Sequence, residues 1–545
     1  MTKKILYYRI YCNTEASYTY TWKETTPTVC PNNNAHSIDT NTISILDVVN
    51  SGSGNFDNDG KLSVNPGGLT QFGEQRVSSY KPIFQNYALY NIINNQVYTY
   101  FSATGGTITG NVNGTEIDLN ISASVGSYTV LRSTKVCKYR PGYNIIVRWN
   151  VLFAEPVANC LQFGGLGNNG SDVYFCYNGL DFGVRYSTGG YSEVRYLTIT
   201  TAETTSTNAT IVVNGVSHTV PLTDANEDTS FTAYQIAKYS FTGWSVYSVG
   251  NIVIFTADAV GSKGSTYSFS TGGTSVASFS QIKEGTALTT TFVNRTAWNG
   301  YSTMVQDLDP TKRNMYCIEY SWYGSGNMTF KVFNSVSSTY ETVHTISFSN
   351  LYQEPSLTQP NMYLTQGIAS LGSTSAKTIR VAGGFAATEG EYIVNYPMYS
   401  VDNQVSIAPN IETVIIALRN RDNIYGFTNN SEILIRQIVF NTDGNKGTTI
   451  RVIKNPTLLS AGTARDYTKW EYINESQSIG VVDKKSRTFT GGNVLATYFI
   501  PRSEEKLIDL NTREIFIHKR DVIIITATST SICDIYSAVS IVEDY

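Results

Sequence analysis

The stretch from Leu131 to Ser187 decides the fold: LRSTKVCKYRPGYNIIVRWNVLFAEPVANCLQFGGLGNNGSDVYFCYNGLDFGVRYS. Within it, residues Asn144 to Phe153 alternate so that Trp149 and its apolar neighbours share one face of a predicted strand. The step Asn178-Gly179 stands between two aromatic-rich segments, which is the strongest short-range signal for a β-hairpin. We expect the other strands over Cys160–Phe163, Val173–Tyr177 and Phe182–Tyr186, with a glycine-rich turn over Gly164–Gly170. The stretch therefore predicts the middle of an antiparallel β-sandwich.

The composition favours an all-β protein with neutral polar surfaces. Charged residues make up 15% of the chain, against about 25% in a typical globular protein. Tyrosine (38 residues) and glycine (43 residues) are abundant. The length of 545 residues predicts roughly three or four domains. Surfaces of this kind suit shell-like or fibrous assemblies and carbohydrate contacts better than nucleic acid.

Charge and hydropathy argue against two kinds of partner. The formal net charge is −4, and no run of Lys or Arg is longer than a pair such as Lys484-Lys485. The clustered positive charge that binds a nucleic-acid backbone is therefore missing. No apolar run approaches the roughly 18 residues of a membrane span. The opening MTKKILYYRIYCNTE lacks the apolar core of a signal peptide, which predicts folding in a cytoplasm.

The cysteines are expected to be reduced and buried. Their odd number, their wide spacing and their apolar strand surroundings do not match a disulfide framework. They are Cys12, Cys30, Cys137, Cys160, Cys176, Cys317 and Cys533.

Residues 1–48 read as a small N-terminal module with a candidate metal site. We expect strands over Ile5–Tyr11 and Tyr18–Trp22, and turns over Thr26–Asp47. Cys12, Cys30 and His36 could be three of four zinc ligands, but no fourth Cys or His lies nearby and the C-x2-C spacing does not occur. The favoured interpretation is two buried thiols and a turn histidine, so no metal site is predicted.

The rest of the chain reads as a linker, two sandwiches and one insertion. The linker covers 49–70, and its Asp57–Gly60 lacks the glutamate and helices of a calcium-binding EF-hand. A central sandwich is split into 71–196 and 291–400, and a C-terminal antiparallel sandwich covers 401–545. The intervening 197–290 has the order β-β-α-β-β of a small α+β insertion.

Two local features of the insertion set its expected structure. Asn214-Gly215 predicts a hairpin, and the segment after it predicts a helix capped by Thr229 or Ser230. Because the sandwich pattern continues on both sides, we predict that Leu131–Ser187 pairs with Asp307–Phe333 across the insertion.

The sequence predicts no catalytic and no cofactor-binding residues, and hence no enzyme. Of the four histidines, His218 and His344 lie on strand patterns, where a lone histidine is usually structural because functional work needs partners in reach. No nucleophile elbow, zinc-protease motif, P-loop or dinucleotide fingerprint occurs. The acidic pairs are expected in solvated turns, since neighbours in sequence need not face each other across a cleft. These pairs are Asp307 with Asp309 and Glu504 with Glu505.

Tyrosines beside glycines offer a second kind of candidate site. Tyr186, Tyr191 and Tyr196 surround Gly189-Gly190 and could form a sugar-binding or protein-binding rim. The favoured alternative is that these tyrosines pack at a sandwich edge with their hydroxyl groups in water.

Four stretches carry a resemblance to a known family. They are YYRIYCNTEASY with TPTVCPNNNAHSID, LRSTKVCKYRPGYNIIVRWNVLFAEPVAN with DVYFCYNGLDFGVRY, LDPTKRNMYCIEYSWYGSGNMTFKV, and the ending IVEDY. Through them the chain resembles virion structural proteins (head-fibre, decoration or tail-associated) of tailed double-stranded DNA phages, including crAss-like phages, and of giant DNA viruses. The second and third stretches also resemble a concanavalin-type or laminin-G-type jelly roll, which implies a lectin-like central sandwich.

This resemblance implies a non-enzymatic protein of the virion surface, assembled in the host cytoplasm. The N-terminal module would anchor a head fibre, a capsid decoration or a tail-associated component, and the sandwiches would project for assembly or host contact. The implied partners are further copies of the chain in a trimer or dimer, capsid or tail proteins, and a host-surface glycan. The competing hypothesis is a carbohydrate-binding or carbohydrate-active protein, such as a tail-fibre receptor-binding protein. A bacterial adhesin is a third hypothesis, which the missing export signal opposes.

Overall fold

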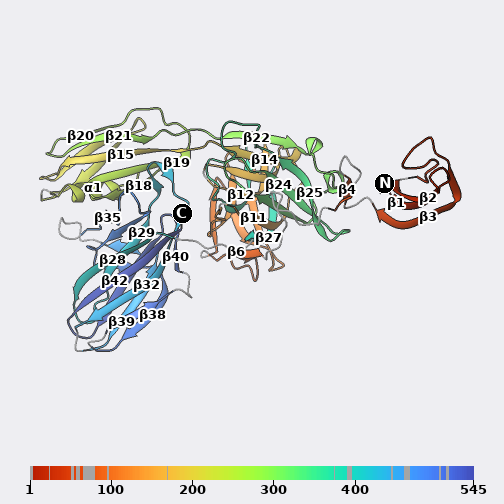
Figure 1. Ribbon diagram of the computed structural model, residues 1–545. Coiled ribbons are helices and arrows are strands. Elements are labelled where there is room, and N and C mark those ends of the chain that lie inside the picture. The colour runs from red at the N-terminus through yellow and green to blue at the C-terminus, as the bar shows by residue number, and fades with distance from the viewer. Residues whose placement is uncertain are drawn as a thin grey trace. The chain divides into compact units, whose positions relative to one another are not determined.

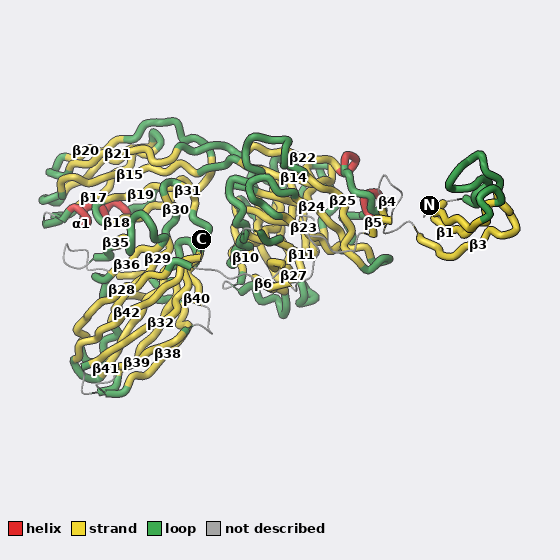
Figure 2. The backbone as a smooth tube through the Cα atoms, viewed as in Figure 1, coloured by secondary structure: helices red, strands yellow, loops and turns green. Residues whose placement is uncertain are grey.

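The computed structural model describes most of the chain and shows a mainly β protein, as predicted (Figure 1). The described residues are 4–23, 25–50, 54–56, 62–64, 80–94, 97–140, 142–168, 170–226, 228–373, 375–389, 396–443, 446–459, 467–502, 505–510 and 515–544. Figure 2 shows strands throughout, with helices confined to short segments of the part described. The chain divides into two units, 1–78 and 79–545.

The first unit is built on a three-stranded antiparallel sheet in the order β2-β1-β3. Its strands are β1 (Lys4–Cys12), β2 (Ser17–Lys23) and β3 (Ile38–Asn50), and a small hairpin follows with β4 (Gly54–Phe56) and β5 (Leu62–Val64). The start of β3 corrects the prediction of turns up to Asp47, because these polar residues pair with β1 from the register Cys12↔Ile38 onward. The stretch Asp57–Gly60, for which we rejected a calcium site, lies outside the described residues.

The central sandwich consists of two large antiparallel sheets. The seven-stranded sheet runs β22 (Thr289–Asn294), β14 (Asp181–Thr188), β13 (Asp172–Asn178), β12 (Cys160–Gly167), β26 (Tyr363–Ser370), β10 (Tyr128–Ser133) and β7 (Tyr98–Ala103). The eight-stranded sheet runs β25 (Thr339–Ile346), β24 (Met328–Asn334), β23 (Asn314–Tyr320), β11 (Ile145–Leu152), β27 (Lys377–Glu389), β9 (Ile117–Ile121) and β8 (Thr107–Gly110), with β6 (Tyr80–Tyr87) also on β27. The connection between β22 and β23 holds η1 (Arg295–Ala297) and α2 (Met304–Asp307).

Strand β11 confirms the predicted pairing across the insertion. It pairs with β23 in the register Trp149↔Tyr316 and with β27 in the register Trp149↔Gly384. Between the sheets, the rings of Trp149 and Phe175 lie 6.2 Å apart and those of Phe175 and Tyr316 lie 4.9 Å apart. All three side chains are buried. This aromatic cluster therefore packs the two sheets of the central sandwich together, and it draws on segments before and after the insertion.

The glycines of β12 correct another prediction. The sequence predicts a glycine-rich turn from Gly164, whereas β12 continues to Gly167 and the turn lies beyond it. A Cβ at Gly164 would lie 2.8 Å from the Trp149 indole nitrogen, and one at Gly167 would lie 2.0 Å from the Tyr174 hydroxyl. The glycines therefore make room for large rings on both faces of the sheet.

The insertion is a small α+β layer, as its pattern indicates. One sheet runs β18 (Trp244–Val249), β19 (Ile252–Val260), β15 (Ser192–Thr201) and β21 (Val276–Lys283), and the other runs β17 (Val216–Leu222), β16 (Thr207–Val213) and β20 (Ser268–Thr271). Helix α1 (Thr229–Lys238) is capped by Asp228, not by Thr229 or Ser230, because the Asp228 carboxylate accepts from two backbone N–H groups of the first turn. Strand β15 belongs to this sheet, so the insertion begins at Ser192, five residues before the predicted start.

The C-terminal part is a second antiparallel sandwich. One sheet runs β28 (Met398–Ile407), β42 (Cys533–Asp544), β32 (Glu432–Thr442) and β39 (Glu505–Asp509), with β40 (Ile515–Ile517) also on β32. The other runs β35 (Trp470–Tyr472), β36 (Gly480–Asp483), β29 (Thr413–Asn420), β41 (Val522–Ser529), β33 (Thr448–Lys454) and β38 (Asn493–Ile500). Two short hairpins flank them, β30 (Asn423–Ile424) with β31 (Phe427–Thr428) and β34 (Thr457–Leu459) with β37 (Thr488–Thr490). Isoleucine and valine side chains fill the space between the sheets.

Two expectations from composition can be compared with the fold. All seven cysteines are free and buried, as predicted. No helix among the described residues is long and apolar enough to cross a membrane.

We predict that the aromatic cluster carries the stability of the central sandwich. Replacing the fully buried Phe175 by alanine removes its contacts with Trp149 and Tyr316 and should lower the free energy of unfolding by about 3–5 kcal/mol. Urea unfolding followed by tryptophan fluorescence measures the change. Leu180→Ala in the neighbouring turn is the control, because Leu180 is 65% exposed and should change stability by no more than about 0.5 kcal/mol. Equal effects of the two substitutions would contradict the prediction.

Candidate functional site

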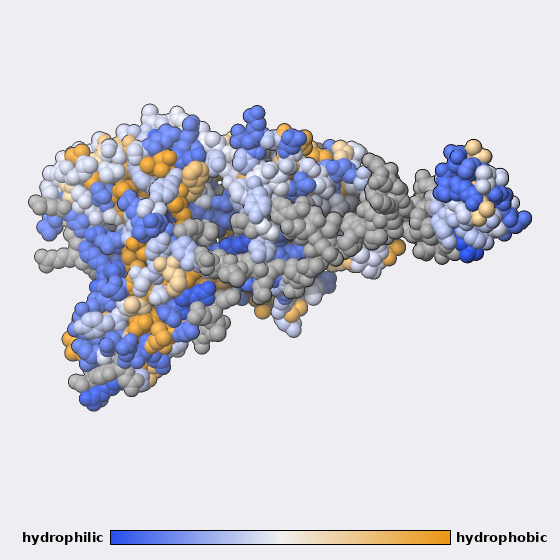
Figure 3. Space-filling view, viewed as in Figure 1, coloured by the Kyte–Doolittle hydropathy of each residue, from blue (hydrophilic) through white to orange (hydrophobic). Residues whose placement is uncertain are grey.

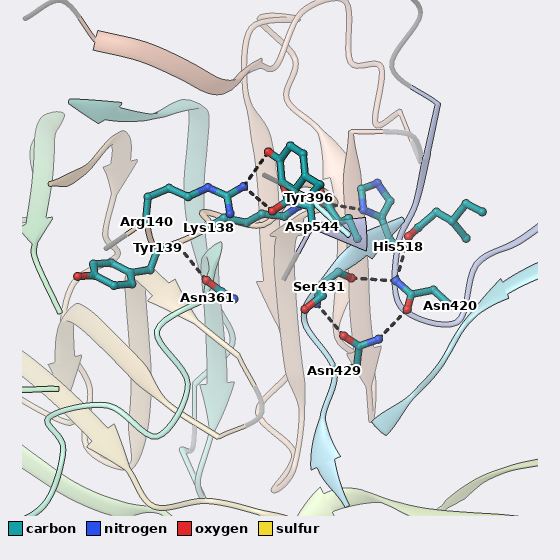
Figure 4. A network of polar contacts seen from close by, with 12 residues as sticks. Lys138, Tyr139, Arg140, Asn361, Tyr396, Asn420, Asn429, Ser431, His518 and Asp544 are labelled. Carbon is teal, nitrogen blue, oxygen red and sulfur yellow. Dashed lines mark hydrogen bonds and ion pairs between the residues drawn. The ribbon is translucent and has the colours of Figure 1, made fainter. Parts of the chain in front are cut away.

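A buried polar network joins the central sandwich to the C-terminal sandwich (Figure 4). Lys138 and Arg140 come from the connection between β10 and β11, and both reach the carboxylate of Asp544 at the end of β42. Lys138 Nζ also lies 2.7 Å from Glu432 Oε2, and His518 Nδ1 lies 2.9 Å from Glu432 Oε1. Since Glu432 and Asp544 are direct register partners, their like charges need the cation that Lys138 supplies.

The electrostatics of Glu432 follow from these partners. Burial by itself raises the pKa of its carboxyl group, but Lys138 and His518 outweigh burial, so the pKa of Glu432 lies well below its usual range. A buried ion pair adds little net stability compared with apolar packing, yet removing one partner is costly. The network therefore acts mainly to fix how the two sandwiches pack.

Amide side chains extend the network at the same junction. Asn420 Nδ2 donates to the backbone oxygens of Ser431 (2.8 Å) and Ile517 (3.0 Å), and Asn429 Nδ2 donates to Asn420 Oδ1 (2.6 Å). On the central side, Asn361 Oδ1 accepts from the backbone N–H of Tyr139 at 2.8 Å. These bonds hold the loops on both sides of the junction.

A cavity of about 310 Å³ opens beside the network. Its described lining includes the basic side chains of Lys81, Lys135, Lys138, Arg140 and Arg436, and the carboxylates of Glu432 and Asp544. Both carboxylates are held by cations, which does not suit a glycosidase, where one carboxyl group must donate and the other must attack or deprotonate. The cavity is part of a structural joint.

The insertion is fixed to the C-terminal sandwich in a similar way. Asp422 is fully buried and lies 2.9 Å from both Arg419 Nη2 and Arg520 Nε. The hydroxyl group of Ser245, on β18 of the insertion, donates to Asp422 Oδ2 at 2.8 Å. Burial raises the pKa of Asp422, but the two arginines outweigh it, so the pKa is lowered.

An open groove of about 260 Å³ lies on the outer face of the C-terminal sheet β28-β42-β32-β39, whose strands run side by side in Figure 1. The register sets its composition, since Tyr536 on β42 stands between Gln404 on β28 and Asn441 on β32. In the next row, Ala538 stands between Asp402 and Val439, and this small side chain leaves the groove open.

The groove presents a ring flanked by polar planar groups. Tyr536 is 45% exposed, and its hydroxyl group accepts from Gln404 Nε2 at 2.9 Å. The side chain of Asp402 is almost fully exposed at 87%, with Lys484 Nζ at 3.8 Å. Of the described lining residues, Asp402 alone carries a carboxylate. This site is hard to predict from the sequence, because only the strand register brings its residues together.

The tyrosines that the sequence suggests as a rim do not form one. Tyr186, Tyr191 and Tyr196 are each half-buried. Tyr186 packs against Phe348, and Tyr191 lies under Lys283 Nζ at 4.1 Å. The three rings serve separate packing sites, which agrees with the favoured alternative of edge packing.

The remaining candidates occupy structural positions. His218 packs against Phe241, with ring centroids 4.9 Å apart, and Nδ1 of the buried His344 accepts from the backbone N–H of Asn299. Asp309 accepts from the hydroxyl group of Thr311 within a turn. Glu504 lies outside the described residues.

The candidate zinc ligands are brought together in the first unit. Cys12 and Cys30 are buried, as predicted, and His36 lies beside Cys12 with 3.8 Å between sulfur and Nδ1. Sequence reasoning missed Glu15, whose Oε1 lies 3.2 Å from His36 Nδ1.

Comparison with known proteins reveals only distant structural likeness. No protein family and no curated protein matches the chain in sequence. A legume lectin-like domain from Entamoeba histolytica is 10% identical with a TM-score of 0.23, and covers 58% of this chain and 100% of its own. A lectin from Bauhinia forficata in complex with GalNAc is 8% identical with a TM-score of 0.19, covering 57% and 99%. A GH43 glycoside hydrolase is 9% identical with a TM-score of 0.26, covering 70% and 60%. With TM-scores this low, these likenesses assign no function to the chain.

We predict that Glu432 makes the junction sensitive to acid. Because its pKa is lowered in the folded state, its contribution is fully present above its unfolded pKa of about 4.3 and is lost as the pH falls below that value. Glu432→Gln should destabilise the protein by about 3–5 kcal/mol at neutral pH, because Lys138 loses a buried partner. Urea unfolding measured from pH 7 to pH 3 should show a smaller loss of stability for the variant than for the wild type.

The matched control is Glu471→Gln. Glu471 belongs to the same sandwich but pairs with Lys469 at the surface, with half of its side chain exposed, so its removal should cost no more than about 1 kcal/mol. An unchanged pH dependence in Glu432→Gln would rule out this role for the junction.

Proposed function

We propose that the chain is a non-enzymatic carbohydrate-binding protein and that the groove around Tyr536 takes a neutral sugar. The observation that carries this proposal is the row Gln404, Tyr536 and Asn441 across three strands, with an open floor at Ala538. Its volume of about 260 Å³ lies just below the roughly 300–1,000 Å³ of small-molecule pockets, which suits one or two sugar rings.

The chemistry of the groove matches the two kinds of surface on a sugar. The exposed ring of Tyr536 can pack against the apolar C–H face of a pyranose. The amide groups of Gln404 and Asn441 each offer a donor and an acceptor, which pair with adjacent hydroxyl groups. The carboxylate of Asp402 at the rim disfavours acidic sugars, so we propose neutral hexoses as the ligand class.

The surface of the second unit agrees with a polar, uncharged ligand. Figure 3 shows hydrophobic and hydrophilic residues intermixed on the visible face of the second unit. The low charge content of 15% leaves neutral polar groups as the main recognition chemistry.

The setting we propose is the surface of a virus particle, where the protein would be a head-fibre, decoration or tail-associated component that contacts host glycans. The sequence resemblance supports this setting, and so does the division into a small unit, 1–78, and a large one, 79–545, which suits an anchor that carries a binding head. We propose that the chain forms a homo-oligomer, a trimer or a dimer, because closed symmetric assembly is the rule for such proteins.

The glycan proposal predicts a specific effect at Tyr536. A glycan array probed with the full chain should identify neutral hexose ligands, and calorimetry with the best of them should give the affinity. Tyr536→Ala should weaken binding about tenfold or more, equivalent to about 1.4 kcal/mol. Tyr536→Phe keeps the ring and loses only the hydrogen bond from Gln404, so its effect should be smaller.

Phe499→Ala provides the matched control, because Phe499 is a 60% exposed aromatic residue on strand β38 of the other sheet. This variant should bind like the wild type. Absence of glycan binding, or equal binding by Tyr536→Ala, would refute the proposal.

The oligomer proposal has a separate test. Sedimentation of the full chain at micromolar concentration should give the mass of a dimer or trimer of the 60.1 kDa chain. A stable monomer that is also missing from purified virus particles would contradict the virion setting but would leave the sugar groove untouched.

A further inference from the structure

We propose that the first unit carries a structural zinc site whose four ligands are Cys12, Glu15, Cys30 and His36. The four candidate ligand atoms, two sulfurs, one carboxylate oxygen and one imidazole nitrogen, all lie within 4.8 Å of one another. This site is independent of the proposed sugar groove, since every ligand belongs to residues 1–78.

Two of the ligand spacings agree with tetrahedral zinc. Bond lengths of about 2.3 Å to sulfur and about 2.0–2.2 Å to nitrogen and oxygen place a sulfur and a nitrogen ligand about 3.6 Å apart, and a nitrogen and an oxygen ligand about 3.4 Å apart. Cys12 Sγ and His36 Nδ1 are 3.8 Å apart, and His36 Nδ1 and Glu15 Oε1 are 3.2 Å apart. Both spacings lie within about 0.2 Å of these expected values.

The loops that carry the ligands are tied together by backbone hydrogen bonds. Cys12 ends β1, and the turn after it brings Glu15 round, while Cys30 and His36 lie in the connection between β2 and β3. The Cys30 N–H donates to the His36 carbonyl oxygen at 3.4 Å, and the Asn13 N–H donates to Ser37 at 3.0 Å. The ligands are therefore held in place by two loops that the sheet itself brings together.

Backbone amides also point at both sulfurs. The N–H groups of Thr14 and Glu15 donate to the Cys12 sulfur, and those of Asn32 and Asn33 donate to the Cys30 sulfur. Backbone N–H groups two and three residues after each cysteine are outer hydrogen bonds of the kind that orient the ligands of a metal site. This matching arrangement at two separate cysteines is not needed by a thiol that merely fills a core.

The carboxylate is oriented by a hydrogen bond of its own. Asn32 Nδ2 donates to Glu15 Oε2 at 3.0 Å, which leaves Oε1 facing His36. Such outer hydrogen bonds commonly fix the ligands of metal sites. Two thiolates and one carboxylate supply three negative charges against the two positive charges of zinc, so the loaded site carries one net negative charge.

The small size of the first unit gives the site a physical role. Among the side chains described there, the buried hydrophobic ones are Tyr8, Ile10, Cys12, Cys30 and Pro27. In a unit that covers only residues 1–78, a single core supplies little stability, and such units commonly add a staple such as a disulfide or a metal. The two thiols remain free, and in a reducing cytoplasm the staple that fits them is zinc.

The test measures zinc in the full chain, purified without chelators. Elemental analysis should find about one zinc per chain, and Cys30→Ser and His36→Gln should each abolish it. Glu15→Gln should release zinc to a chelator faster than the wild type, and Glu15→His should restore retention. Replacement of zinc by cobalt should give the thiolate-to-metal absorption bands of a tetrahedral site, which a misfolded variant cannot imitate.

Two controls separate the site from general effects on folding. Cys160→Ser alters a buried thiol of the central sandwich and should keep its zinc. Asp39→Asn alters an acid of the first unit that accepts from the Asn41 N–H, and it should keep zinc as well. Chain without metal whose seven thiols are all reactive after denaturation, or a disulfide between Cys12 and Cys30, would overturn the proposal.

Discussion

The pairing of β11 with β23 and β27 is the constraint on which the second unit depends. It requires that the chain leave the central sandwich after β14 and return at β22 beside it. Tyr191 and Thr286 meet this requirement, since each donates its N–H to the carbonyl oxygen of the other at 3.0 Å. With these two hydrogen bonds at its base, the insertion can fold separately and leave the sheets of the sandwich intact. The aromatic cluster of Trp149, Phe175 and Tyr316 can therefore form from segments far apart in sequence.

Several of the few charged residues of this chain lie at the junctions between its sandwiches and its insertion. Lys138 bridges Glu432 and Asp544 between the two sandwiches, and Asp422 binds arginines and Ser245 between the C-terminal sandwich and the insertion. Apolar contact alone would tolerate small slides of one layer over another, whereas a buried ion pair loses its partner if it moves. The charges therefore contribute orientation more than stability. A rigid arrangement of this kind suits a protein that presents a binding face.

The sequence predicted the fold well where local pattern and tertiary pairing agree. The Asn178-Gly179 hairpin, the helix of the insertion and the pairing across it all follow from periodicity and turn residues. The prediction from sequence was wrong where contacts with other strands determine the local structure. Strand β3 looks like turns because its polar residues gain their partners only from β1. The glycines of β12 look like a turn because the rings of Trp149 and Tyr174 that need the space come from other strands.

The two proposed sites show why the same sequence reveals one kind of site more readily than another. Three zinc ligands are visible as Cys12, Cys30 and His36, because thiols and imidazoles are rare enough to be noticed. Glu15 is hard to recognise as a ligand because carboxylates are common. Its spacing from Cys12 does not by itself indicate a metal site, and only the turn after Cys12 brings Glu15 close to His36. The groove around Tyr536 is harder still, since tyrosine and amides occur throughout the chain. The groove is defined by strand register alone. A slip of one residue in β42 would turn Tyr536 into the core, and Gln404 and Asn441 would then have no ring between them.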